Sequence, residues 1–117
     1  MKKIVKEELL TLEYMQGRSR PEDGYFEGGV AGPQHLEQLG VCVQKELRLN
    51  MVTDEMEETG AMQVSISGNR DVLFNLGRYL VAVARLDTED PDYHDHFDSL
   101  KHVNGCAPCR LIVRLEP

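Results

Sequence analysis

A His-x-His pair and a Cys-x-x-Cys pair lie close together near the C-terminus. They comprise His94 and His96, then Cys106 and Cys109, with His102 between them. Imidazole nitrogen and thiolate sulfur are ligands that zinc prefers, and the two-residue spacing lets both sulfurs of a turn face one point. The sequence therefore predicts a zinc site with ligands His94, His96, Cys106 and Cys109. The alternative interpretation is that the histidines hydrogen-bond within a connection and the cysteines pack beside the last strand.

Other catalytic chemistry has weaker support in the residue pattern. Asp95 and Asp98 beside the two histidines could serve as acid–base groups, but carboxylates often neighbour histidine in acidic segments. The Cys-Ala-Pro-Cys run is similar to a redox dithiol, yet no helix follows it to lower the pKa of its first thiol. Because no nucleophile elbow and no phosphate-binding glycine motif occurs, the sequence predicts no catalytic residues and a non-enzymatic protein.

Cysteine count and charge restrict the environment and the partners. Three cysteines is an odd number, which favours reduced thiols or a metal site over a disulfide scaffold. The net charge of −7 opposes nucleic-acid binding and favours a cationic partner. No apolar run approaches the roughly 20 residues that span a bilayer, and charged residues interrupt the N-terminus early. We therefore expect a cytoplasmic protein that contacts neither membrane nor nucleic acid.

The elements that would position these residues follow from periodicity. Residues 41–51 and 62–66 alternate apolar and polar side chains, which predicts two strands that each bury one face. Asn69 can cap a helix over residues 70–86, whose apolar positions recur every three or four residues. Gly77 is interpreted as the position that lets this helix approach the sheet closely. Residues 111–115 form a short last strand, while 17–40 and 93–98 read as connections, the former with one helical turn near 34–39.

These elements predict an α+β fold, with a mostly antiparallel sheet and one main amphipathic helix packed on one face. The length of 117 residues suits a single domain over residues 1–117. The last strand has no successor to cover its edge, so either a monomer or a homodimer through that edge is compatible with the sequence.

Three segments carry a resemblance to a known family. They are Val64–Arg70, which ends a strand in Ser-Gly-Asn-Arg before the amphipathic helix, Asp92–Asp98, which contains Tyr-His-Asp-His-Phe, and the terminal Leu-Ile-Val-Arg. The C-terminal half thereby resembles an immunity-protein family of bacterial polymorphic toxin systems. The resemblance implies a protein that binds and neutralises a cognate toxin and has no catalytic activity. Its partner-binding surface would use the loop 17–40 and residues Tyr93, His94, Asp95, His96 and Asp98.

Overall fold

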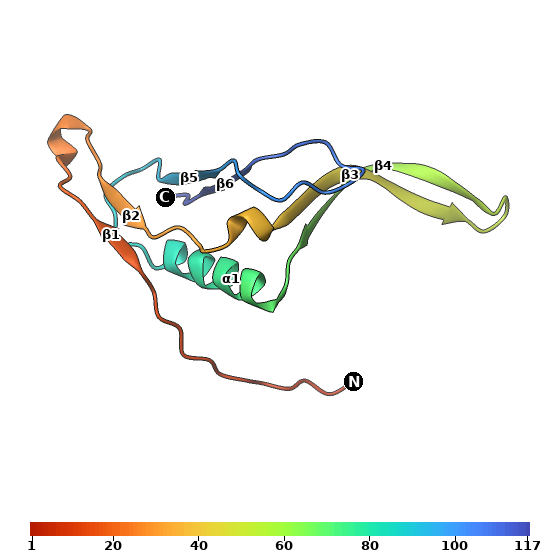
Figure 1. The fold of residues 1–117 in the computed structure, drawn as a ribbon, viewed down its shortest axis with the longest axis horizontal. Coiled ribbons are helices and arrows are strands. Elements are labelled where there is room, and N and C mark those ends of the chain that lie inside the picture. The colour runs from red at the N-terminus through yellow and green to blue at the C-terminus, as the bar shows by residue number, and fades with distance from the viewer.

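The computed structural model describes residues 1–117 and contains three separate antiparallel strand pairs and one α-helix (Figure 1). The pairs are β1–β2, β3–β4 and β5–β6. The α+β prediction is confirmed, whereas the single domain stays a prediction. The elements in chain order are β1 Tyr14–Gln16, the 3-10 helix η1 Pro21–Asp23, β2 Gly28–Val30, the 3-10 helix η2 Leu36–Gln38, β3 Gly40–Asn50, β4 Glu55–Ser67, α1 Arg70–Ala84, β5 His94–Phe97 and β6 Leu111–Arg114.

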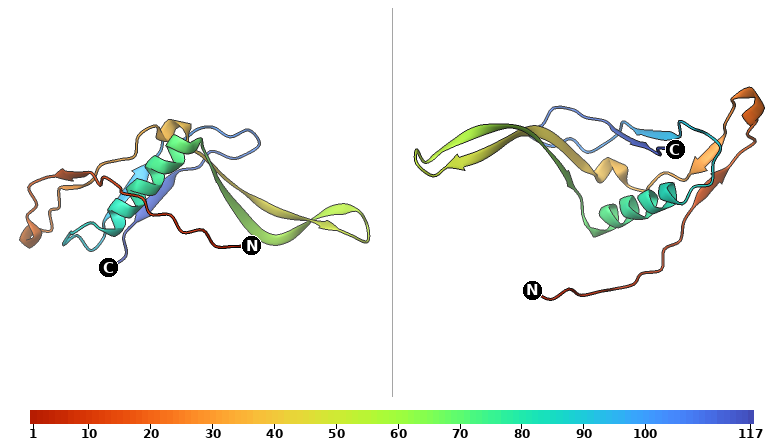
Figure 2. Two further views of the ribbon diagram at one scale, coloured as in Figure 1. Left: turned by 90° about the horizontal axis from the view of Figure 1, so that it is seen from below. Right: turned by 180° about the vertical axis from the view of Figure 1, so that it is seen from behind.

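The molecule is elongated, with extents of 62 × 38 × 26 Å and a radius of gyration of 18.8 Å. A compact chain of this length would have a radius of gyration of about 13 Å. Figures 1 and 2 show the reason: the β3–β4 hairpin projects from one end, and the N-terminal segment runs free of the rest. The core is correspondingly small, because only 11 of the 117 residues are buried.

Helix α1 forms as the sequence predicts. The side chain of Asn69 accepts a hydrogen bond of 2.9 Å from the Val72 amide, and Asp71 lies in the first turn, where a negative charge is favourable. A Cβ at Gly77 would meet no neighbouring atom, so the interpretation of that glycine as a point of close approach is wrong. The buried positions form one stripe along the helix: Val72, Leu76, Tyr79, Ala82 and Val83.

This stripe joins two small apolar clusters. The C-terminal half of α1 packs on Val30 of β2 and on Tyr93, and the N-terminal half packs on Leu39 and Val41. Helix α1 thereby connects the β1–β2 end of the molecule to the base of the long hairpin. No helix here has both the length and the apolar character that crossing a bilayer requires.

The hairpin of β3 and β4 departs from the prediction of half-buried strands. Only Gly40, Val41 and Cys42 at its base are buried, and β4 is exposed along its whole length. Asn50 accepts hydrogen bonds from two amides of the turn, and the register shifts between Lys45 and Leu47. No other element covers β4, even at the base of the hairpin, so the predicted burial of Met62, Val64 and Ile66 is wrong: these side chains are 50 to 63% exposed.

The segment 93–98 also differs from its prediction as a connection, because it contains strand β5. His94 pairs with Arg114 and Phe97 pairs with Leu111, in antiparallel register with β6. Its polar sequence gives little strand signal, and pairing with the apolar β6 supplies the hydrogen bonds that hold it extended. The strand predicted at the C-terminus is present as β6.

Candidate functional site

The Asp95 carboxylate ties three elements together at one end of the molecule. Its Oδ2 accepts a hydrogen bond of 2.5 Å from the Tyr79 hydroxyl of α1 and one of 3.0 Å from the Tyr93 hydroxyl. The Tyr93 oxygen in turn accepts a hydrogen bond of 2.9 Å from the Val30 amide of β2. The backbone can approach this closely because residue 29 is glycine: a Cβ there would lie 2.6 Å from the Tyr93 ring. The network therefore fixes β5 relative to α1 and β2.

The two phenols of this network hold their protons. Burial, followed by the hydrogen bond to Asp95, raises the pKa of Tyr79 well above its usual value of 10. Burial also raises the pKa of Tyr93, and the neighbouring charge of Asp95 acts in the same direction against the lowering effect of the Val30 amide. Both tyrosines therefore act as hydrogen-bond donors to Asp95 at neutral pH, not as bases.

His94 and His96 lie on the other face of β5. Strand alternation turns Asp95 and Phe97 toward α1, where the Phe97 ring meets the Tyr79 ring edge-on at 5.3 Å. The His94 and His96 rings contact each other edge-on, with centroids 4.9 Å apart. His94 Nδ1 lies 2.7 Å from the carbonyl oxygen of Asp92, and the Arg114 guanidinium pairs with the Asp92 carboxylate. The histidines thus form an outward-facing pair.

An acidic groove lies beside this strand. It occupies 780 Å³ between the β1–β2 hairpin and the segment that follows α1, residues 85–95. Arg85 is the only lysine or arginine in its lining. A groove with this charge attracts cationic groups. Its carboxylate residues are Glu27, Asp87, Glu89, Asp90, Asp92 and Asp95.

The residues predicted to bind a partner differ in their exposure to solvent. His96 and Asp98 are exposed, and Asp98 lies 3.7 Å from the Arg110 guanidinium. His94 and Asp95 are half-buried, whereas Tyr93 is buried and acts on the surface only through the position it gives Asp95. Sequence reasoning missed the groove, since Glu27 and residues 87–92 adjoin only after folding.

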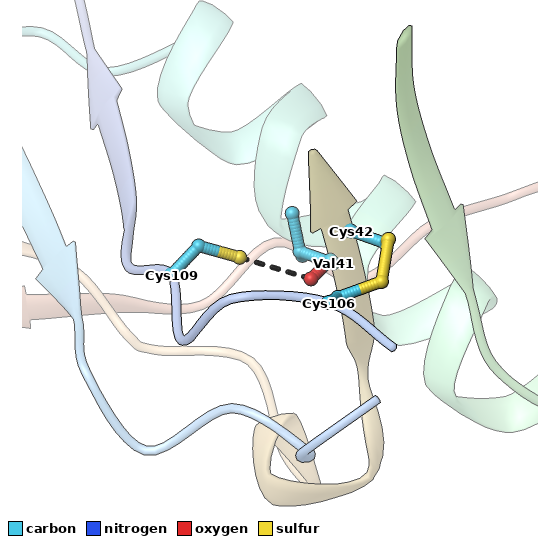
Figure 3. The surroundings of a disulfide bond; sticks show 4 residues. All are labelled: Val41, Cys42, Cys106 and Cys109. Atoms are coloured by element: carbon cyan, nitrogen blue, oxygen red, sulfur yellow. Dashed lines mark hydrogen bonds between the residues drawn. A yellow bond between two sulfur atoms is a disulfide. The ribbon is translucent and has the colours of Figure 1, made fainter. Parts of the chain in front are cut away.

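The four predicted zinc ligands do not come together. No group of three or more histidine, cysteine, aspartate or glutamate side chains is placed to hold a metal ion. Cys106 forms a disulfide with Cys42, and the Cys109 thiol donates a hydrogen bond of 2.9 Å to the Val41 carbonyl (Figure 3). The expectation of reduced cysteines in preference to a disulfide is therefore wrong. The bonded residues are 64 positions apart, and no spacing motif in the sequence marks that pairing. Zinc binding by the predicted set of four ligands would require reduction of the Cys42–Cys106 disulfide, because a disulfide sulfur is not a thiolate.

Part of this chain matches a family of known proteins. Residues 63–115 match the family described as Immunity protein 32. The immunity-protein match begins within β4 and includes α1, β5 and β6, so it contains the histidine pair and the segment 85–95 that lines the groove. It confirms the resemblance to an immunity-protein family that the C-terminal half carries. No curated protein and no solved structure matches the chain.

Proposed function

We propose that this chain is an immunity protein, which binds a cognate toxin and neutralises it by occupying the toxin's surface. The observation that carries the proposal is the match of residues 63–115 to the Immunity protein 32 family. Those residues form α1 and the β5–β6 pair, which together hold one wall of the acidic groove. Neutralisation is by binding alone, without chemistry on the toxin.

The groove and the outer face of β5 are the surface that would meet the toxin. The chain carries a net charge of −7, and the groove gathers carboxylates beside the exposed His96. Complementary charge speeds the encounter of two proteins, and a fast encounter suits an inhibitor that must act before its toxin does damage. The partner surface is therefore basic, as the surface of a toxin that acts on nucleic acid would be.

Binding accounts for the site better than catalysis does. The candidate acid–base groups already have structural partners: Asp95 accepts hydrogen bonds from two phenols, and His94 Nδ1 is at hydrogen-bond distance from a backbone carbonyl. These bonds use Oδ2 of Asp95 and Nδ1 of His94, and they fix the orientation of both side chains. Their hydrogen bonds thus support a rigid docking surface more than a reactive centre.

Growth rescue tests this function. A toxin domain encoded beside this gene is expressed from an inducible promoter, with and without the intact chain, and the complex of the two purified proteins is measured by calorimetry. We expect restored growth and a complex whose affinity falls as salt is added. A toxin that kills equally in the presence of the chain, and that forms no complex with it, would contradict the proposal.

Matched charge reversals locate the surface. Asp87→Lys with Glu89→Lys places two cations at the groove, and both native side chains are exposed, so the fold should be kept. We expect the dissociation constant to rise at least about tenfold. The control, Glu7→Lys with Glu8→Lys, makes the same change of charge in the exposed N-terminal segment. If both pairs weaken binding equally, only net charge matters and the groove is not the docking surface.

A further inference from the structure

The outer edge of β4 is an unprotected strand edge. Strand β4 pairs with β3 alone, and all thirteen of its residues are exposed. At the base of the hairpin the other edge is occupied, because Lys101 bridges to Gly40 and Cys106 is bonded to Cys42 of β3. The free hydrogen-bonding groups of the hairpin base therefore lie along β4.

From Met62 to Ser67 this edge lacks the devices that keep strands apart, because the register shift of the hairpin lies before Met62. The seven residues Ala61–Ser67 contain no charge and no proline, and Met62, Val64 and Ile66 are each at least 50% exposed. Strand edges that face solvent usually carry lysine, proline or a bulge, because an open edge templates pairing with another chain. A lone two-stranded hairpin is also only marginally stable in water. Both facts favour a partner that covers this segment.

The amount of exposed surface points the same way. The chain exposes 9646 Å², whereas a compact protein of its mass exposes about 6,500 Å². The excess of about 3,000 Å² is larger than the roughly 800 Å² that each partner loses in an interface of standard size. The free N-terminal segment and the projecting hairpin are the two parts of the chain that extend away from the rest (Figure 2).

We infer that two copies of this chain pair through β4, antiparallel about a two-fold axis at Val64. In this register Met62 of one copy lies opposite Ile66 of the other, Gln63 lies opposite Ser65, and Val64 meets its own counterpart. Every residue in the paired stretch is uncharged. The carboxylates of Glu55, Glu57 and Glu58 stay outside it, so no like charges are opposed. The two hairpins become one four-stranded sheet, and three or more strands with an apolar face are far more stable than two.

A second copy of the chain is a better occupant of this edge than the toxin or the N-terminal segment, because it is present whether or not a toxin is bound. The proposed toxin would cover the edge only in the complex, which would leave an uncharged strand edge open whenever the immunity protein is free. The N-terminal segment of the same chain lies elsewhere and carries Lys2, Lys3, Lys6, Glu7 and Glu8 among its first residues, which suits solvent better than an apolar sheet. An obligate, apolar contact between copies meets the requirement at all times.

Light scattering after size-exclusion chromatography tests the dimer with the intact chain alone, so the result does not depend on any toxin. We expect twice the 13.3 kDa chain mass. Val64→Lys opposes two cations at the axis and should raise the dimer dissociation constant at least about 100-fold. Met56→Lys is the matched control, because it makes the same change at a residue of similar exposure on the same strand, outside the paired stretch. Its dissociation constant should change less than about threefold.

Cross-linking checks the register. In a Cys109→Ser background the native disulfide leaves no free thiol, so Val64→Cys introduces the only reactive one. Opposed residues of antiparallel strands lie close enough for a disulfide, and we expect a cross-linked dimer under mild oxidation. Met56→Cys should give none. A monomeric wild-type chain at 100 µM-scale concentration, an intact dimer in the Val64→Lys variant, or equal cross-linking at both sites would overturn the inference.

Discussion

The four tyrosines provide an internal test of the network around Asp95. Each Tyr→Phe variant removes one oxygen atom, and the four variants together remove five hydrogen bonds in different settings. Tyr79→Phe removes a bond to a charged acceptor. Tyr93→Phe removes a similar bond and also leaves the amide of Val30 without its acceptor in a buried place. Tyr14→Phe removes a bond to a neutral carbonyl.

The expected losses in the free energy of unfolding follow from these acceptors. A hydrogen bond to a charged group contributes about 1.5–3 kcal/mol, which is the expected cost of Tyr79→Phe. For Tyr93→Phe the unpaired Val30 amide adds about 1–3 kcal/mol to the loss of the bond to Asp95, so the total is about 2.5–6 kcal/mol. Tyr14→Phe should cost about 0.5–1.5 kcal/mol because its acceptor, the Ala82 carbonyl, is uncharged. Tyr25 is exposed, and its replacement should have no measurable effect.

Urea unfolding followed by far-ultraviolet circular dichroism measures this series, because the chain has no tryptophan to report by fluorescence. Protomer concentration must be equal for all variants, since association would add to the apparent stability. A double-mutant cycle between Tyr79→Phe and Asp95→Asn should give a coupling of about 1 kcal/mol or more. The reasoning is refuted if Tyr79→Phe and Tyr93→Phe destabilise the protein no more than Tyr14→Phe does.

Four further outcomes are expected. In the same urea titration, replacing Cys42 and Cys106 by serine should lower the free energy of unfolding by about 4 kcal/mol, because the disulfide closes a long loop of the unfolded chain. Cys109→Ser loses one weak hydrogen bond and should cost less than about 1 kcal/mol. Stability should fall as pH rises above 10, because Tyr79 ionises in the unfolded chain while the folded state keeps its proton. The slope of the free energy of unfolding approaches about 1.4 kcal/mol per pH unit for each such group, and a flat profile from about pH 9 to about pH 11 would contradict the raised pKa of Tyr79. The oxidised chain should retain no stoichiometric zinc after dialysis, as measured by elemental analysis, because a disulfide sulfur is not a thiolate; one bound zinc per chain would contradict this. Deleting residues 1–9 should leave the unfolding midpoint unchanged, since their side chains are exposed.

The features that the sequence determined by itself are those with a local cause. Asn69, the acidic first turn and the apolar stripe are enough to place the helix, which begins at Arg70 as predicted. Alternation over residues 41–51 locates β3 to within a residue at each end. Capping bonds and side-chain periodicity involve neighbours within a few positions, so they can be read directly from the order of residues.

Only the tertiary structure decided which distant groups meet. Alternation in β4 marks an apolar face but does not say whether anything covers it, and in this fold nothing in the same chain does. The partner of Cys106 proved to be Cys42 and not a metal shared with its neighbour Cys109. Asp95 looks like any acidic loop residue until α1 brings the Tyr79 phenol to it and β2 brings the Val30 amide to the neighbouring Tyr93. Such contacts join residues dozens of positions apart, and their free energies depend on chain paths that no short stretch of sequence encodes.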